Sequence, residues 1–178
     1  MILTPFLRKL ALTVHLAASV GWLGAVAAFL ALAVVGLTRQ DIQTVRAAYV
    51  AMALTTWFVI VPLAFASLLS GVISSLGTRW GLFRYYWVVI KLLITLVATI
   101  ILLVHTQLID VLGAVAAKTT VLGADLQSSQ LLMVVASVAA LLALLMATAL
   151  SVYKPQGMTR YGARWQHARR ARSARPHS

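Results

Sequence analysis

Residues 10–37 read LALTVHLAASVGWLGAVAAFLALAVVGL and contain no charged side chain. A transmembrane helix needs about 20 consecutive, mostly apolar residues, so this stretch is long enough to cross a bilayer. Residues 49–76, 87–112 and 131–153 are similar in length and hydrophobicity. None of them alternates like a barrel strand, which is only ~9–11 residues long. The sequence therefore predicts four transmembrane helices.

The composition supports this interpretation. Of the 178 residues, 62% are hydrophobic and 10% are charged, against roughly 45–50% and about 25% in an ordinary soluble domain. A chain this short cannot hide so much apolar surface in one aqueous core. We expect an all-α, integral membrane four-helix bundle over residues 1–153, followed by a basic tail over residues 154–178. Pro62, near the middle of the second predicted helix, predicts a kink.

The orientation follows from the basic residues. Eleven of the 15 Lys and Arg residues lie before the first helix, between the second and third, or after the fourth. The positive-inside rule then places both termini in the cytoplasm of a multi-pass protein of the cell membrane. We expect the dense cluster at residues 164–172 to lie on anionic lipid. It lacks the interleaved aromatic residues of a nucleic-acid stacking platform, so no nucleic-acid partner is expected.

Several kinds of site are excluded or lack a motif. The chain has no Cys, which excludes disulfides, thiolate-ligated clusters and covalently attached c-type haem. It also has no catalytic carboxylate pair, nucleophile elbow, P-loop or dinucleotide-binding motif. The sequence leaves open whether the protein is an enzyme.

Three ionisable residues fall inside predicted membrane helices, where such residues are costly and often functional. They are His15, Lys91 and His105. His15 shares a helix face with Ala18, Ser19 and Trp22 through spacings of three, four and seven residues. It suits either an interhelical hydrogen bond or a neutral imidazole ligand to a metal or a haem iron.

Small residues on the same helix suit close helix contacts. Gly21, Gly24 and Ala28 would let a neighbouring backbone approach, either within the bundle or in a homodimer.

Lys91 lies near the start of the third predicted helix, at nearly the same depth as His15. It either snorkels to the cytoplasmic interface or pairs with an anionic group beside His15, such as a haem propionate. The only acids, Asp41, Asp110 and Asp125, fall on or near the other side of the membrane. No carboxylate of the chain therefore obviously neutralises Lys91.

His105 follows Lys91 by fourteen residues and shares its helix face with Thr95, Ala98 and Leu102. At ~1.5 Å per residue it lies about 20 Å further along, so one haem cannot be held by both His15 and His105. His105 falls near the level of two methionines, Met52 and Met133. A His/Met set of this kind suits copper(I).

Three patterns carry a resemblance to known families. They are His15-x6-Trp22-x-Gly24, Trp87-x3-Lys91-x-Leu93, and the tail Tyr153-Lys154-Pro155-x-Gly157-x-Thr159-x-Tyr161-Gly162. Together they resemble a family of uncharacterised actinobacterial small integral membrane proteins, over most of the chain. That resemblance implies the topology and no particular activity.

A more distant resemblance is to copper-resistance D-type membrane proteins and to small bacterial membrane protoporphyrinogen oxidases. The oxidases imply haem b binding that depends on residues matching His15 and Lys91, with Trp22 in the first-helix pattern. Val104 precedes His105 where the oxidases have a Tyr-His pair.

Three functions are compatible with these residues. The first is a haem-b-binding redox or electron-transfer protein with a redox partner, using His15 as axial ligand, Lys91 near a propionate, and Trp22. The second is a copper-associated membrane protein using His105 with Met52 or Met133. The third is a non-catalytic membrane subunit whose polar residues fix helix packing.

Overall fold

The computed structural model describes residues 4–77, 84–118 and 125–153, together with Gly157, Thr159 and Arg164. The rest of the predicted basic tail, Arg79, and the side chains of Asp110 and Asp125 lie outside the described residues. The elements are α1 (Pro5–Thr38), α2 (Ile42–Thr55), the π-helix η1 (Thr56–Ile60), α3 (Val61–Gly77), α4 (Tyr86–Lys118) and α5 (Asp125–Tyr153).

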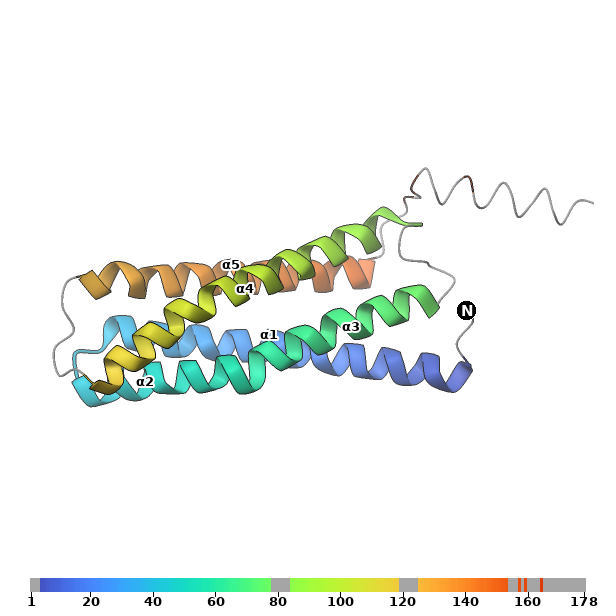
Figure 1. Ribbon diagram of the computed structural model, residues 1–178. Helices are drawn as coiled ribbons and strands as arrows, with labels where there is room; N and C mark the ends of the chain where they lie inside the picture. Colours follow the sequence, from blue (N-terminus) through green and yellow to red (C-terminus); the bar gives the residue numbers. More distant parts are fainter. Residues whose placement is uncertain are drawn as a thin grey trace, which may run out of the picture.

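Four segments of the described chain are long and apolar enough to cross a membrane. They are Pro5–Thr38, Ile42–Leu76, Tyr86–Gln107 and Ser128–Tyr153. The second runs through α2, η1 and α3 without a break (Figure 1). The predicted all-α bundle of four membrane-length helices is confirmed.

The helices form a four-cornered bundle. α1 packs on α2, α3 and α5, and α4 packs on the same three helices. α1 and α4 therefore occupy opposite corners. The start of α1, the end of α3, the start of α4 and the end of α5 meet at one end (Figure 1). We call it the basic end, because Arg8, Lys9 and Arg84 lie there.

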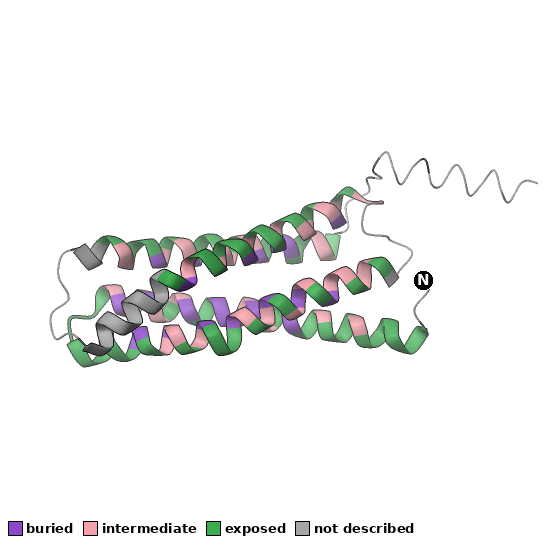
Figure 2. Cartoon of the chain, in the orientation of Figure 1, coloured by how far each residue is buried: buried purple, intermediate pink, exposed green. Residues whose placement is uncertain are grey.

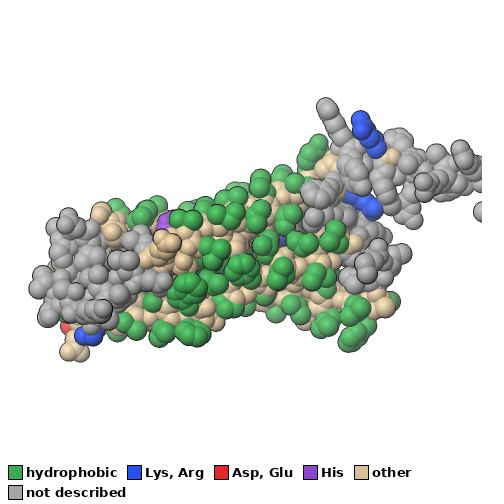
Figure 3. All heavy atoms as spheres, in the orientation of Figure 1, with side chains coloured by type: hydrophobic (Ala, Val, Ile, Leu, Met, Phe, Trp, Pro, Cys, Tyr) green, Lys and Arg blue, Asp and Glu red, His purple; other side chains and the backbone are tan. Residues whose placement is uncertain are grey.

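The outer surface of the bundle is apolar. Phe58, Val104 and Leu142 are 60–76% exposed, and hydrophobic side chains cover much of the visible surface in Figure 3. The buried residues lie mostly along the inward faces of the helices (Figure 2). In water each Å² of this apolar surface would cost about 25 cal/mol. Lipid removes that cost, as expected of a membrane protein.

Pro62 changes the helix as its chemistry requires. Proline has no N–H, so the carbonyl of Phe58, four residues earlier, loses its usual partner and is crowded by the ring. The chain widens into the π turn η1, in which the Val61 N–H donates to the Thr56 carbonyl. The buried Thr56 hydroxyl donates to the Met52 carbonyl at 2.8 Å. The segment changes direction there (Figure 1), in agreement with the predicted kink.

The small residues of α1 do not all serve helix contacts. A Cβ at Gly21 would lie 3.2 Å from Leu63 Cδ1 of α3, which is a close approach between the helices. No described atom lies within 4 Å of a Cβ at Gly24, and both Gly24 and Ala28 are exposed. The prediction that Gly24 and Ala28 pack helices within the bundle is wrong, because they lie on its outer face. A homodimer through this face stays a prediction.

Candidate functional site

A polar cluster joins all four corners of the bundle near the basic end. The Lys91 ammonium of α4 lies 3.0 Å from His15 Nε2 of α1 and 2.6 Å from Ser151 Oγ of α5. His15 Nδ1 in turn contacts Ser67 and Ser70 of α3. His15 and Lys91 therefore lie at the same depth, as the sequence predicts. The amine turns into the bundle and does not snorkel to the interface.

The hydrogen bonds of His15 fix its tautomer. Nδ1 lies 3.0 Å from the backbone carbonyl oxygen of Ser67, which can only accept, so Nδ1 carries a hydrogen. In the neutral ring Nε2 then has the lone pair and accepts from Lys91. A second ring proton would face the ammonium across 3.0 Å. The contact therefore favours one positive charge on the His15–Lys91 pair over two.

α3 holds the imidazole from the other side. A Cβ at Gly71 would lie 3.1 Å from His15 Cε1 and 3.4 Å from Nδ1, so only glycine leaves the ring its present position. Ser19 Oγ of α1 and Ser67 Oγ of α3 share a hydrogen bond of 2.8 Å one turn away. The ring is thus fixed between α3 and Lys91.

None of the three acids of the chain can neutralise Lys91. Asp41 lies in the turn between α1 and α2, at the opposite end of the bundle. Asp110 is nineteen residues further along α4, which is ~28 Å at 1.5 Å per residue. Asp125 begins α5, ~39 Å from Ser151 by the same rule. The charge on the His15–Lys91 pair therefore has no aspartate counter-ion, and the chain has no Glu.

A polar pocket of about 100 Å³ lies beside Lys91. Two of its hydroxyl groups are committed to their own helices: Thr95 donates to the Lys91 and Leu92 carbonyls, and Thr148 donates to that of Leu144. Lys91 has three hydrogens, and the described residues offer two acceptors for them. Its third N–H is available to a group in the pocket. The pocket is lined by His15, Leu16, Ser19, Val20, Trp22, Ser67, Lys91, Thr95, Leu144, Thr148 and Ser151.

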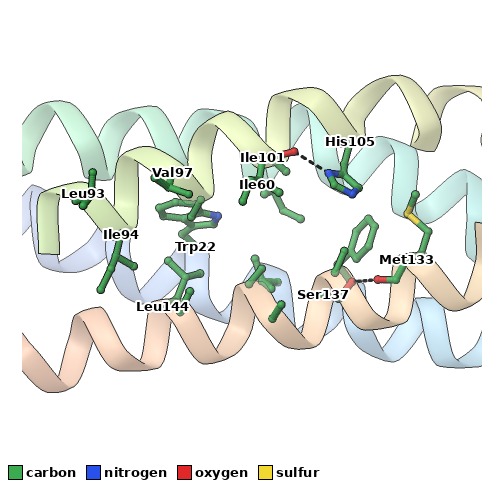
Figure 4. Close-up of a pocket in the computed structure, with 18 residues that line it drawn as sticks. Trp22, Ile60, Leu93, Ile94, Val97, Ile101, His105, Met133, Ser137 and Leu144 are labelled. Carbon is green, nitrogen blue, oxygen red and sulfur yellow. Dashed lines mark hydrogen bonds between the residues drawn. The ribbon is translucent and has the colours of Figure 1, made fainter. Parts of the chain in front are cut away.

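An apolar cavity of about 550 Å³ adjoins the polar pocket, and Trp22 and Leu144 line both. Side chains of α1, α4 and α5 surround the cavity (Figure 4). Leu93, Val97 and Ile101, which line it on α4, are 44–57% exposed, so the cavity opens toward the surrounding lipid. The predicted face of α4 is confirmed: Lys91 and Thr95 line the pocket, and Ala98, Leu102 and His105 line the cavity.

His105 and Leu93 line opposite ends of the cavity (Figure 4), and His105 is fourteen residues beyond Lys91 along α4. Its Nδ1 donates to the Ile101 carbonyl at 2.9 Å, so Nε2 has the lone pair and no partner within the described part of the chain. Met133 lines the same end, whereas Met52 is buried in the core and does not line the cavity. Across the described residues, no three His, Cys, Asp or Glu gather into a metal-binding group.

This arrangement does not fit a haem ligated by His15. Only Nε2 could bind iron, and Lys91 occupies its lone pair. The polar pocket beside it is about 100 Å³, so a ligand as large as haem would also have to enter the adjoining apolar cavity. Lys91 would have to move away before His15 could bind iron. The assignment of His15 and Trp22 to a haem site therefore stays a prediction.

Sequence reasoning missed the serine cluster of α3. Ser67, Ser70 and Gly71 lie on one helix face at spacings of three and four, which was the available signal. Serine is common in membrane helices, so the spacing alone does not separate a site from ordinary packing.

The fold and the site together define a multi-pass membrane protein with a partly buried, cationic polar cluster. Comparison of the chain with protein-family models, with curated proteins and with solved structures gives no match.

Proposed function

We propose that this protein binds an anionic group against Lys91, in the cytoplasmic leaflet of the cell membrane. The observation that carries the proposal is the positive His15–Lys91 pair, which lies inside the bundle with no aspartate or glutamate of the chain within reach. Ionisable side chains inside membrane helices are costly and usually pair with another group. An anion in the pocket would offset that cost. The cytoplasmic side follows from the positive-inside rule, since the basic end carries the pair.

The pocket supplies the contacts that such a group needs. The third N–H of Lys91 can donate a charge-assisted hydrogen bond, which is shorter and stronger than a neutral one. His15 Nε2 and Ser151 Oγ hold the amine in place. Lys91 is thus the binding residue, and His15 and Ser151 position it.

Haem b is one ligand that carries such groups, because its propionates are carboxylates, and it would supply one-electron chemistry when bound. The sequence resemblance supports it, whereas the bond between Lys91 and His15 Nε2 counts against ligation by His15. The absorption spectrum of protein purified from haem-replete cells tests this version. A Soret band that His15→Ala abolishes would support it, and the lack of any Soret band would remove it.

The test of anion binding compares amphiphiles that differ only in their head groups. Thermal unfolding is measured in an uncharged detergent with dodecanoate, dodecanol or dodecyltrimethylammonium. We expect dodecanoate alone to raise the Tm, and Lys91→Met to abolish the increase. At a concentration about a hundredfold above Kd, binding adds ~2.7 kcal/mol to the free energy of unfolding.

Lys9→Met is the matched control, because Lys9 is an exposed cation at the same end of the bundle. It should leave the dodecanoate effect unchanged. An equal increase in wild type and Lys91→Met, or its loss in Lys9→Met, would contradict the proposal. In that case the third function, a non-catalytic membrane subunit, becomes the better account of the cluster.

A copper site at His105 is a second candidate, favoured by the free Nε2 at the cavity end that Met133 also lines. Imidazole and thioether are ligands that suit copper(I). We expect bound copper(I) in the purified protein to fall in His105→Ala and in Met133→Leu. Met146→Leu is the control, because Met146 is 59% exposed and lines neither cavity. Copper content that is equal in all four proteins would exclude this site.

A further inference from the structure

The polar pocket and the apolar cavity adjoin each other inside the bundle. They share Trp22 and Leu144 as lining residues. All the charge is at one end, at Lys91, and the apolar cavity extends from there along α4 and α5. A ligand that fills both parts must therefore have an anionic head and an apolar body.

The two spaces together also have the orientation of a lipid in the cytoplasmic leaflet. The head pocket is near the basic end, and the cavity runs from it toward the centre of the membrane. The hydrocarbon core is ~30 Å thick, so the chains of one leaflet span about 15 Å. Ten residues of α4 cover that length at ~1.5 Å each, which is the distance from Lys91 to Ile101. One acyl chain headed at Lys91 would thus end within the cavity, short of His105.

We infer that the occupant is a fatty acid, with its carboxylate on Lys91 and its single chain in the apolar cavity. This inference rests on the proposed anion site and names the class of ligand. The chain would enter sideways from the bilayer, past the exposed side chains of Leu93 and Val97 on the rim. The charges would balance, because the fatty acid carries one negative charge and the His15–Lys91 pair carries one positive charge.

The size of the head pocket favours a carboxylate over a phospholipid head. Water occupies ~30 Å³ per molecule in the liquid, so a pocket of about 100 Å³ holds roughly three water-sized groups. A carboxylate fits this space, whereas a glycerophosphate with two chains is larger and would need a second channel. Small side chains line the cavity on α5, at Ala136, Ala139, Ala140 and Ala143, and these leave room for a chain.

Trp22 provides a direct readout, because it lies where the two spaces meet. It is about 10 Å beyond His15 along α1 by helix rise, which is near the middle of a bound chain. Bromine atoms quench tryptophan fluorescence on contact, so the probe is octadecanoate with bromines at mid-chain. Trp57 is 45% exposed and can also be quenched by the probe. The quenching measured in Trp22→Phe is therefore subtracted from that of the wild type, which leaves the contribution of Trp22.

We expect saturable quenching of Trp22 that octadecanoate relieves by competition. Octadecanol and a phosphatidic acid with two octadecanoyl chains should compete at least about tenfold more weakly. Lys91→Met should weaken probe binding by about tenfold or more, which is the effect of losing one hydrogen bond to a charged group.

Cavity variants test where the chain lies. Ala140→Phe fills the apolar cavity and should abolish the Trp22 quenching. Ala149→Phe, on an exposed position of α5 outside both spaces, is the matched control and should retain it. Ala143→Leu is a smaller filling variant that keeps the test usable if Ala140→Phe fails to fold.

The outcomes separate the head site from the chain. If dodecanoate stabilises the protein through Lys91 but both filling variants retain full quenching, the anion site survives and the fatty-acid inference falls. Equal competition by octadecanol or by phosphatidic acid would also overturn it, since the head or the single chain would then not be selected. If neither dodecanoate stabilisation nor probe binding differs between the wild type and Lys91→Met, the proposed function itself is overturned.

Discussion

Replacement of Gly71 by alanine tests the geometry of the His15 site most directly. The new Cβ would lie 3.1 Å from His15 Cε1 and 3.4 Å from Nδ1, whereas ordinary contacts are 3.4–4 Å. The ring would have to move by a few tenths of an ångström, and its bonds to Ser67 O and Lys91 Nζ, both 3.0 Å, would lengthen. Overpacking of this kind costs about 1–3 kcal/mol.

The matched control is Gly24→Ala on α1, where no described atom lies within 4 Å of the new Cβ. Alanine is preferred to glycine inside a helix by ~0.5–1 kcal/mol. Gly24→Ala should therefore increase the free energy of unfolding by up to about 1 kcal/mol. Gly71→Ala gains the same propensity and loses more by overpacking, so we expect it to be destabilising. The difference between the two variants measures the contact with His15.

The assay is reversible unfolding in mixed micelles, with the free energies combined in a double-mutant cycle. In the His15→Ala background the ring is gone, so Gly71→Ala should become as favourable as Gly24→Ala. The reasoning is refuted if Gly71→Ala stabilises the wild-type protein. It is equally refuted if the cost of Gly71→Ala is unchanged in the His15→Ala background.

Three further predictions concern other parts of the bundle. A Cβ at Gly36 would lie 2.9 Å from both Cζ and the phenol oxygen of Tyr49, so Gly36→Ala should lower the free energy of unfolding by ~1–3 kcal/mol. Tyr49→Leu removes both atoms, so the cost of Gly36→Ala should disappear in that background, and an unchanged cost would contradict this. Ser151→Ala removes an acceptor at 2.6 Å from the half-buried Lys91 ammonium and should lower the dodecanoate-induced Tm increase in the same thermal scans. An unchanged increase would show that Ser151 does not position the amine. Hydrogen bonds from the hydroxyl and the amide of Thr44 hold the pKa of the Asp41 carboxyl below its usual value. Its stabilising contribution is therefore present above its unfolded pKa of ~3.9 and is lost as the pH falls through the folded pKa. Asp41→Ala should lower stability near neutral pH and flatten the decline in acid, and a parallel acid profile in both proteins would contradict this.

The four membrane-spanning helices were predictable because a bilayer requires a minimum length of apolar sequence. Each of the four apolar runs in the sequence is long enough to meet that requirement. The helix ends were not. α2 begins at Ile42, seven residues before the predicted start, because Asp41 caps it with bonds to the Thr44 amide and hydroxyl. The polar side chains of Gln43 and Arg46 in its first turns hide that start from a hydrophobicity argument.

The candidate site was only partly predictable. Counting residues from the predicted start of each helix places His15 and Lys91 at the same depth in the membrane. It does not show that the two side chains bond directly, because that depends on α1 and α4 facing each other across the bundle. The apolar cavity is a further example: the alanines of α5 are visible in the sequence, but the empty space opposite them depends on how α4 crosses the bundle.

The π turn at Thr56–Ile60 sets the rotational phase of α3. An α-helix turns by about 100° per residue, so one residue more or fewer in this turn would rotate the whole of α3 by that angle. Ser67, Ser70 and Gly71 would swing away from His15 and toward a neighbouring helix or the lipid. Single-residue insertions and deletions between residues 56 and 60 should therefore disturb the polar cluster, although η1 contributes no lining residue to the polar pocket.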